Sequence, residues 1–182
     1  MGSSTAGRGR KVLVLMATYN AGRFIAEQLS SLASQSWLHI DVLVSDDGSV
    51  DGTIAHLEAS KAAWTKGTFS LTTGPRGGFA ENFRSLIARF DGGADYVAFS
   101  DQDDVWDNDK LDRAIAWLDR QEPGRPALYC GRTRLIDENG RPIGFSPLFR
   151  KPVSFRNALV QSIAGANTMV LNKAAALVVA EA

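Results

Sequence analysis

The stretch DYVAFSDQDDVW (95–106) decides the fold, because it joins a short apolar run directly to three carboxylates. A short apolar run bounded by polar residues is typical of a strand that is buried on both faces of a parallel sheet. Outward from it, segments with helical spacing of apolar residues separate the predicted strands. The other predicted strands are KVLVLMA (11–17), HIDVLVS (39–45), TFSLTT (68–73) and ALYCG (127–131). The alternation predicts an α/β domain with a mostly parallel central sheet flanked by helices.

Beyond residue 131 the pattern changes. RTRLIDENGRPIG (132–144) predicts a hairpin that turns at Asn139–Gly140, and a short helix is expected over 154–162. A strand over TMVL (168–171) and a helix over AAALVVAEA (174–182) complete the chain. We expect residues 1–10 to form a flexible leader and residues 11–182 to form one domain. Because the last helix has no stop signal, the domain is expected to be truncated at its C-terminus.

The composition excludes several classes of protein. Twenty basic and twenty acidic residues cancel, which gives no support for bulk binding of nucleic acid. The single cysteine, Cys130, cannot form a disulfide within the chain and is expected to be a small buried residue. No run approaches the ~20 apolar residues of a membrane span. These features predict a cytoplasmic domain, which can still act at the inner face of a membrane.

Polar residues follow three of the predicted strands at the point where each strand ends. Ligands of open α/β sheets bind beyond the carboxyl ends of the strands, so these groups are expected to converge on one rim. They are TYN (18–20), DDGS (46–49) and DQDD (101–104).

The acidic group after the fourth predicted strand has the character of a cation site. Asp101, Asp103 and Asp104 repel one another unless a cation neutralises them, and Mg²⁺ or Mn²⁺ prefers such oxygen ligands. In an extended segment Asp101 and Asp103 project to the same side. A solvated loop with helix-capping aspartates is the alternative interpretation. Trp106 follows directly, and it either stacks on a sugar or packs in the core.

The other groups offer contacts to a nucleotide. Asp46 or Asp47 can accept the N3–H of uracil or thymine or a ribose hydroxyl, and Ser49 or Asp51 is expected to cap the next helix. Thr18 and Asn20 are either nucleotide contacts or ordinary turn formers. Arg76, in GPRGG (74–78), can reach ribose or phosphate, and a plain surface loop is the alternative.

Three stretches carry a resemblance to a known family: KVLVLMATYNAGRFIAEQLSSLASQS (11–36), DVLVSDDGSVDGT (41–53) and DYVAFSDQDDVW (95–106). Over residues 11–172 the chain resembles the family 2 glycosyltransferases, which have the GT-A fold, and SDQDDVW (100–106) looks most like bacterial rhamnosyltransferase-like members. The resemblance implies transfer of a sugar, with inversion, from a UDP- or dTDP-sugar to a glycan or lipid-linked acceptor in polysaccharide synthesis. It also implies Mg²⁺ or Mn²⁺ as the cofactor.

The resemblance assigns roles to individual residues. The donor nucleotide is expected at Thr18, Asn20, Asp46, Asp47, Arg76 and Asp101, and the metal at Asp103 and Asp101. The acceptor or sugar is expected near Asp104, Trp106, Gly165 and Asn167. No catalytic base is assigned, because family members supply it beyond the position of Ala182. The 182 residues are therefore expected to bind metal and nucleotide but to transfer sugar poorly. A nucleotidyltransferase and a non-catalytic nucleotide- or glycan-binding module are the alternatives.

Overall fold

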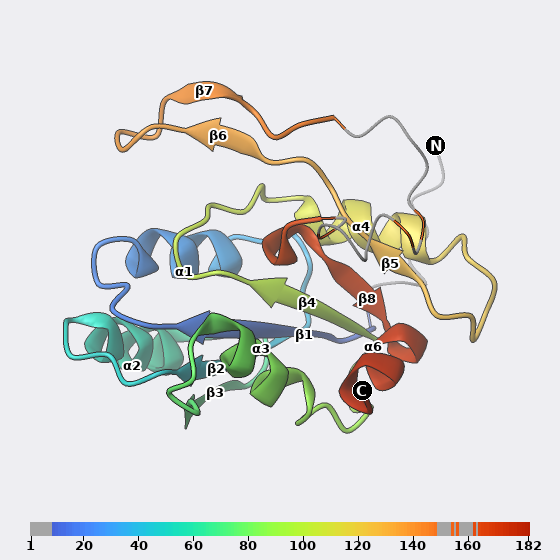
Figure 1. The fold of residues 1–182 in the computed structure, drawn as a ribbon, viewed down its shortest axis with the longest axis horizontal. Helices are drawn as coiled ribbons and strands as arrows, with labels where there is room; N and C mark the ends of the chain where they lie inside the picture. Colours follow the sequence, from blue (N-terminus) through green and yellow to red (C-terminus); the bar gives the residue numbers. More distant parts are fainter. Residues whose placement is uncertain (1–8, 149–153, 155, 157–161, 163) are drawn as a thin grey trace.

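Strands and helices alternate through the first two thirds of the chain (Figure 1). The computed structural model describes residues 9–148, 154, 156, 162 and 164–182. The elements run in the order β1 (Val12–Thr18), α1 (Ile25–Ala33), β2 (Ile40–Asp46), α2 (Thr53–Ala63), β3 (Phe69–Thr73), α3 (Phe79–Ile87), β4 (Tyr96–Ser100) and α4 (Lys110–Leu118). After them come β5 (Leu128–Tyr129), β6 (Arg134–Ile136), β7 (Pro142–Phe145), the short 3₁₀ helix η2 (Ala166–Thr168), β8 (Val170–Asn172) and α6 (Lys173–Ala180).

The central sheet has the strand order β3-β2-β1-β4-β8-β5. The four strands β1 to β4 are parallel to one another, while β8 is antiparallel to both β4 and β5. From β1 the chain builds the sheet in one direction through β2 and β3, and it then returns to place β4 on the other side of β1. The strand order therefore reverses between β1 and β4, and such a switch point opens a crevice at the carboxyl ends of the strands. The predicted mostly parallel sheet is confirmed.

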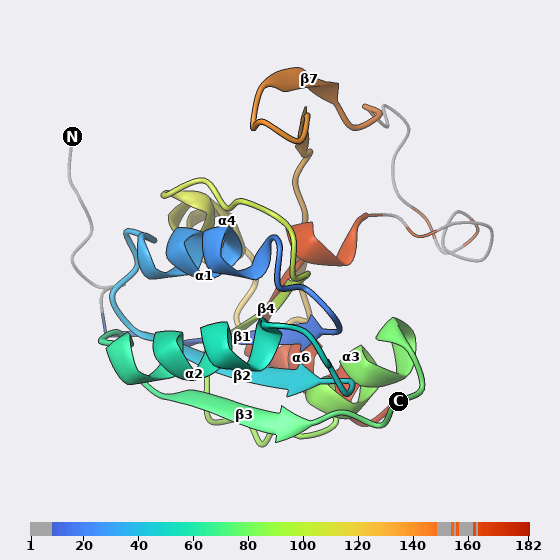
Figure 2. The ribbon, with the colours of Figure 1, turned by 90° about the vertical axis from the view of Figure 1, so that its left-hand side faces the viewer.

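Helices cover both faces of the sheet (Figure 2). On one face, α1, α2 and α4 bury Ile25, Leu57 and Ile115 against β1 and β2. On the other face, α3 and α6 bury Leu86 and Ala176. A strand covered on both faces has no solvent side, which explains why β1 reads as a continuous apolar run.

The later part of the chain departs from the sequence prediction in places. The strand expected over 127–131 is only two residues long, and 166–168 form η2 before β8. The hairpin expected over 132–144 is confirmed as β6 and β7, which extend away from the body of the domain (Figure 1). The helix predicted over 154–162 lies outside the described residues.

The leader predicted over 1–10 lies outside the described residues up to residue 8. Arg10, by contrast, belongs to the folded domain, where its guanidinium pairs with Asp119. Among the helices that the structure describes, none is long and apolar enough to cross a bilayer.

Candidate functional site

Asp46 joins the carboxyl ends of β1 and β2. Its carboxylate accepts hydrogen bonds from the Thr18 hydroxyl (2.9 Å), from the backbone N–H groups of Gly48 (3.0 Å) and Ser49 (2.8 Å), and from the Ser49 hydroxyl (2.6 Å). Thr18 and Asp46 are both buried. The polar atoms of both side chains thus build the turn after β2, and their expected contact with a nucleotide stays a prediction.

Asn20 connects the loop after β1 to the same turn. Its side-chain oxygen accepts the Val50 N–H (3.0 Å), and its own N–H donates to the Ser49 hydroxyl (2.8 Å). Asn20 has a φ of 47°, which places it in the left-handed region that non-glycine residues seldom occupy. Such strained residues gather at functional sites, where the surrounding structure holds them in place.

Asp47 holds the loop after β3, whereas its neighbour Asp46 holds the turn after β2. Its two oxygens accept the backbone N–H groups of Arg76 (2.6 Å) and Gly78 (3.0 Å). Arg76 has a φ of 60°, and its side chain lies over Gly48, where an added Cβ would come within 3.1 Å of Nε. Gly48 is thus needed for the close approach of Arg76. The structure brings together Asp47 and Arg76, which the sequence predicted separately.

Gln102 closes the crevice between β1 and β4, and sequence reasoning missed it. Its side-chain oxygen accepts the Tyr19 N–H (2.7 Å), and its amide N–H donates to the Tyr19 carbonyl (3.2 Å). One amide side chain therefore fixes the loop after β1 against the acidic segment at the switch point. The sequence did offer one signal: Gln102 is an amide between two carboxylates. A glutamine side chain is long enough to hydrogen-bond to the backbone of a neighbouring loop.

The acidic segment 101–104 leaves β4 at this rim. Burial, together with the charges of Asp104 and Asp103, raises the pKa of Asp101 to about 6. Burial also raises the pKa of Asp104, although a hydrogen bond from Asn167 opposes the shift. Asp103 is exposed, and no hydrogen-bond partner contacts it among the described residues. The segment therefore holds carboxylates that a ligand can neutralise.

Lys110, the first residue of α4, was also missed. Its ammonium group donates to the carbonyl of Asn167 and lies 3.2 Å from the centroid of the Trp106 ring. Burial lowers the pKa of Lys110 to about 7, against the opposing effect of Asp104, Asp101 and Asp107. In sequence this lysine looks like an ordinary residue of an exposed helix start, so only the fold reveals its position.

Asn167 and Asp104, both expected near sugar or acceptor, meet directly: the Asn167 amide donates to Asp104 Oδ2 at 2.6 Å. Gly165 directly precedes η2, and its carbonyl accepts the Thr168 N–H (3.0 Å). Trp106 is only 5% exposed and packs in the core. Of the two interpretations of Trp106, packing is therefore correct, and its ring does not offer a free face to a sugar.

No three His, Cys, Asp or Glu side chains among the described residues are placed to enclose a metal ion by themselves. A cation here would need further ligands. Mg²⁺ commonly binds through one or two carboxylates together with substrate phosphates, and Asp101 and Asp103 fit that mode.

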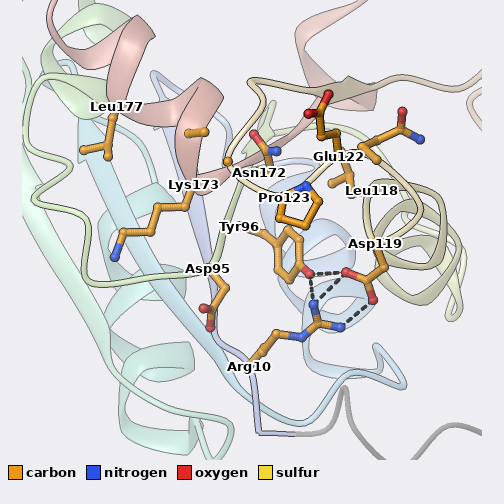
Figure 3. A pocket seen from close by; sticks show the side chains of 13 residues that line it. Arg10, Asp95, Tyr96, Leu118, Asp119, Glu122, Pro123, Asn172, Lys173 and Leu177 are labelled. Atoms are coloured by element: carbon orange, nitrogen blue, oxygen red, sulfur yellow. Dashed lines mark hydrogen bonds and ion pairs between the residues drawn. The ribbon is translucent and has the colours of Figure 1, made fainter.

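A cavity lies at the other end of the sheet (Figure 3). It has a volume of about 490 Å³ and is lined by Arg10, Tyr96, Asp119 and Lys173. Asp119 accepts hydrogen bonds from Arg10 (2.6 Å to Nη1) and from the Tyr96 hydroxyl, both drawn in Figure 3. Tyr96 begins β4 and Asp101 follows its end, so this cavity is separate from the acidic segment.

Comparison with known proteins identifies the family. The model of glycosyl transferase family 2 matches residues 13–175, so the chain belongs to glycosyl transferase family 2. It is 39% identical over 105 residues to the dTDP-rhamnosyl transferase RfbG of Shigella flexneri, an overlap that covers 57% of this chain and 36% of that protein. The chain thus spans little more than a third of that relative's length.

Three solved structures of two proteins show the same fold. TarS 1-349 of S. aureus superposes with a TM-score of 0.65 at 23% identity, covering 90% of this chain and 47% of that one. The same protein in complex with UDP-GlcNAc aligns at 28% identity and a TM-score of 0.53, over 60% of this chain and 31% of that one. The mannosyltransferase PcManGT of Pyrobaculum calidifontis, in complex with GDP-Man and Mn²⁺, has a TM-score of 0.60 at 20% identity, covering 90% and 44%. The α/β fold is that of the GT-A glycosyltransferases.

Proposed function

We propose that this chain binds a nucleoside-diphosphate sugar at the rim where β1, β2 and β4 end, and that the protein transfers the sugar to a hydroxyl acceptor. The observation that carries the proposal is the convergence of the loops after these strands. Asn20 bonds to the turn after β2, Gln102 bonds to Tyr19, and Asp47 holds Arg76. Together with the loop after β3, which carries Arg76, these three loops line one polar rim at the switch point of the sheet, which is where α/β folds bind ligands.

The nucleotide is proposed to lie against Asn20, Asp47 and Arg76. Both oxygens of Asp47 already accept one N–H each, yet a carboxylate oxygen can accept a second hydrogen bond, from a pyrimidine N3–H or a ribose hydroxyl. The guanidinium of Arg76 can pair with phosphate oxygens. The likeness to TarS, which binds UDP-GlcNAc, supports a uridine or thymidine nucleotide.

The diphosphate is proposed to lie beside Asp101 and Asp103. Two carboxylates next to a diphosphate create an excess of negative charge, which Mg²⁺ or Mn²⁺ bound to Asp103 and Asp101 would neutralise. The exposed Asp103 is the more accessible ligand. Asp104 is proposed to support the site without binding the metal, since its Oδ2 already accepts a hydrogen bond from the Asn167 amide.

The proposed reaction forms one bond and breaks another at the anomeric carbon. The acceptor oxygen bonds to this carbon from the face opposite the leaving group, and the bond from the carbon to the diphosphate oxygen breaks with inversion. The electron pair leaves with the nucleoside diphosphate, and the hydroxyl proton passes to a general base. Gly165 and Asn167, beside the acidic segment, are proposed to border the sugar and acceptor.

The finer specificity is also a proposal. Similarity to RfbG favours dTDP-rhamnose as the donor. A glycan or lipid-linked acceptor of cell-surface polysaccharide synthesis is proposed from similarity to WfgD of Escherichia coli, a glucosyltransferase whose name gives alpha-D-GlcNAc-diphosphoundecaprenol as its acceptor. A lipid-linked acceptor would place the reaction at the inner face of a membrane.

Titration calorimetry with UDP and dTDP, with and without Mn²⁺, tests the proposal. We expect Mn²⁺ to strengthen binding, and Asp103→Ala to weaken Mn²⁺-dependent binding by about tenfold, which corresponds to about 1.4 kcal/mol. Asp109→Ala removes an exposed carboxylate that pairs with Arg113 and serves as the matched control, with binding unchanged. Binding that needs no metal and is the same in Asp103→Ala would contradict the proposed donor site.

A further inference from the structure

A lysine ammonium is enclosed within the acidic segment. Lys110 reaches inward from the start of α4, donates to the Asn167 carbonyl and covers the face of the Trp106 ring. Asp101, Asp104 and Asp107 are the charged groups around it. Burying an ammonium group is costly unless hydrogen bonds and opposite charges compensate it. Here one carbonyl, one aromatic face and the neighbouring carboxylates supply that compensation.

The contacts of Lys110 and Asn167 distinguish a fixed carboxylate, Asp104, from an exposed one, Asp103. Asp104 is held in place, because the Asn167 amide donates to its Oδ2 at 2.6 Å. Asn167 is therefore held twice, through its carbonyl by Lys110 and through its side chain by Asp104. Asp103 lies outside this network and is exposed. Lys110 is thus connected to Asp104 through Asn167, and this network does not use the carboxylate that faces solvent.

We propose that Lys110 is a positioning residue of the donor site, a resident cation that fixes Asp104 and η2 together and leaves Asp101 and Asp103 to face the ligand. The proposal rests on the proposed function. A lysine that only filled space in the core could be replaced by an apolar side chain of similar length without changing the binding of a cation. A resident cation repels a second cation at the same rim, so its charge has to be visible in the metal affinity.

The test compares the affinity for Mn²⁺ among three variants, measured by titration calorimetry in the presence of UDP. Lys110→Met keeps the length of the side chain but removes the ammonium group, and we expect it to tighten Mn²⁺ binding about fivefold. Asp104→Asn removes one negative charge while its side-chain oxygen can still accept from Asn167, and we expect about fivefold weaker binding. In the double variant the two changes cancel, and the affinity returns to within about twofold of the wild type.

Arg113→Met is the matched control, because it removes a cation from the same helix on its exposed side. Its charge is screened by solvent, so we expect the Mn²⁺ affinity to stay within about twofold of the wild type. If Lys110→Met lowered the thermal stability and left Mn²⁺ affinity unchanged, Lys110 would be a packing residue and the proposal would be overturned.

Amide hydrogen exchange gives a second measurement that needs no metal. The N–H groups of Thr168 and Met169 donate within η2, to Gly165 and Ala166. We expect faster exchange at both in Lys110→Met and protection close to wild type in Lys110→Arg, which keeps the charge and the donors. Unchanged exchange in Lys110→Met would contradict the proposal that Lys110 holds η2 in place. Failure of the wild type to bind Mn²⁺ with UDP would count against the proposed function alone, and the exchange result would still decide the role of Lys110.

Discussion

The two ends of the parallel sheet treat charge differently. At the amino end, two cations are paired with carboxylates: Arg10 pairs with Asp119, and Lys11 Nζ lies 3.0 Å from Asp41. At the carboxyl end, Asp101 and Asp104 lie near Lys110 without forming an ion pair with it, and the exposed Asp103 adds a third carboxylate to the segment. Paired charges need no further partner, whereas an excess of carboxylates at a switch point of the sheet is typical of a ligand-binding site.

The cavity of Figure 3 lies at the amino end, beside the pair of Arg10 and Asp119. Arg10, Tyr96 and Asp119, which border it, hydrogen-bond to one another. The carboxyl end has strained backbone at Asn20 and Arg76 and carboxylates in excess. The cavity and the excess of carboxylates thus lie at opposite ends of the sheet, and the proposed ligand site follows the carboxylates.

Two neighbouring residues at the carboxyl end, Asp46 and Asp47, are expected to differ in role. Replacing Asp46 gives the largest expected loss of stability. Asp46→Ala leaves the donors from Thr18, Gly48 and Ser49 without an acceptor in a buried place. We expect the free energy of unfolding to fall by about 3 kcal/mol, since each lost hydrogen bond is worth about 1 kcal/mol. Urea denaturation measures it.

Asp47→Ala is the matched variant one residue away. It frees only the N–H groups of Arg76 and Gly78, in an exposed loop where water replaces the carboxylate. We expect a stability loss below about 1 kcal/mol, with nucleotide affinity reduced about tenfold. Equal loss of stability in the two variants would contradict the division of roles between these carboxylates.

The amino end gives a smaller and purely structural effect. Burial opposes ionisation of Asp119, but hydrogen bonds from Arg10 and Tyr96 outweigh it and lower the pKa of Asp119. We expect Asp119→Ala to cost about 1 kcal/mol of stability at neutral pH, since the pair is partly exposed, and to leave nucleotide affinity unchanged.

The pH dependence of this effect has a definite sign. A carboxyl whose pKa is lowered by folding stabilises the protein fully above its unfolded pKa, near about 4, and loses that contribution as the pH falls through the folded value. The difference in stability between wild type and Asp119→Ala should therefore shrink below about pH 4. A difference that persisted unchanged at pH 2, or a change in nucleotide binding, would break the comparison between the two ends.

Much of the fold could be predicted because it depends on local pattern. β1 and β2 are buried on both faces, so their apolar runs are continuous, and the acidic segment follows β4 at once. β8 was harder, because its insertion between β4 and β5 in the antiparallel sense depends on contacts across the sheet. The two-residue β5 could not be distinguished from a longer strand by apolar character alone.

The candidate site was predictable in position but not in detail. Which carboxylate is buried and which is exposed depends on the direction each takes at the end of its strand, so Asp46 and Asp47 could not be separated by sequence. Lys110 and Gln102 are common polar residues, and their importance comes from partners far away in the chain, Asn167 and Tyr19. Trp106 could have packed or faced solvent, and only the position of α1 and α4 around it decides for packing.

The central claim, that the carboxyl end of the sheet is the ligand site, is tested most directly by nuclear magnetic resonance with Mn²⁺ and UDP. The paramagnetic ion broadens the resonances of nearby amides. We predict broadening at Gln102, Asp103 and Gly48 that is lost in Asp103→Ala, with the amides of Asp119 and Gly124 remaining sharp. Broadening centred on Asp119 and Gly124, with Asp103 unaffected, would contradict the account.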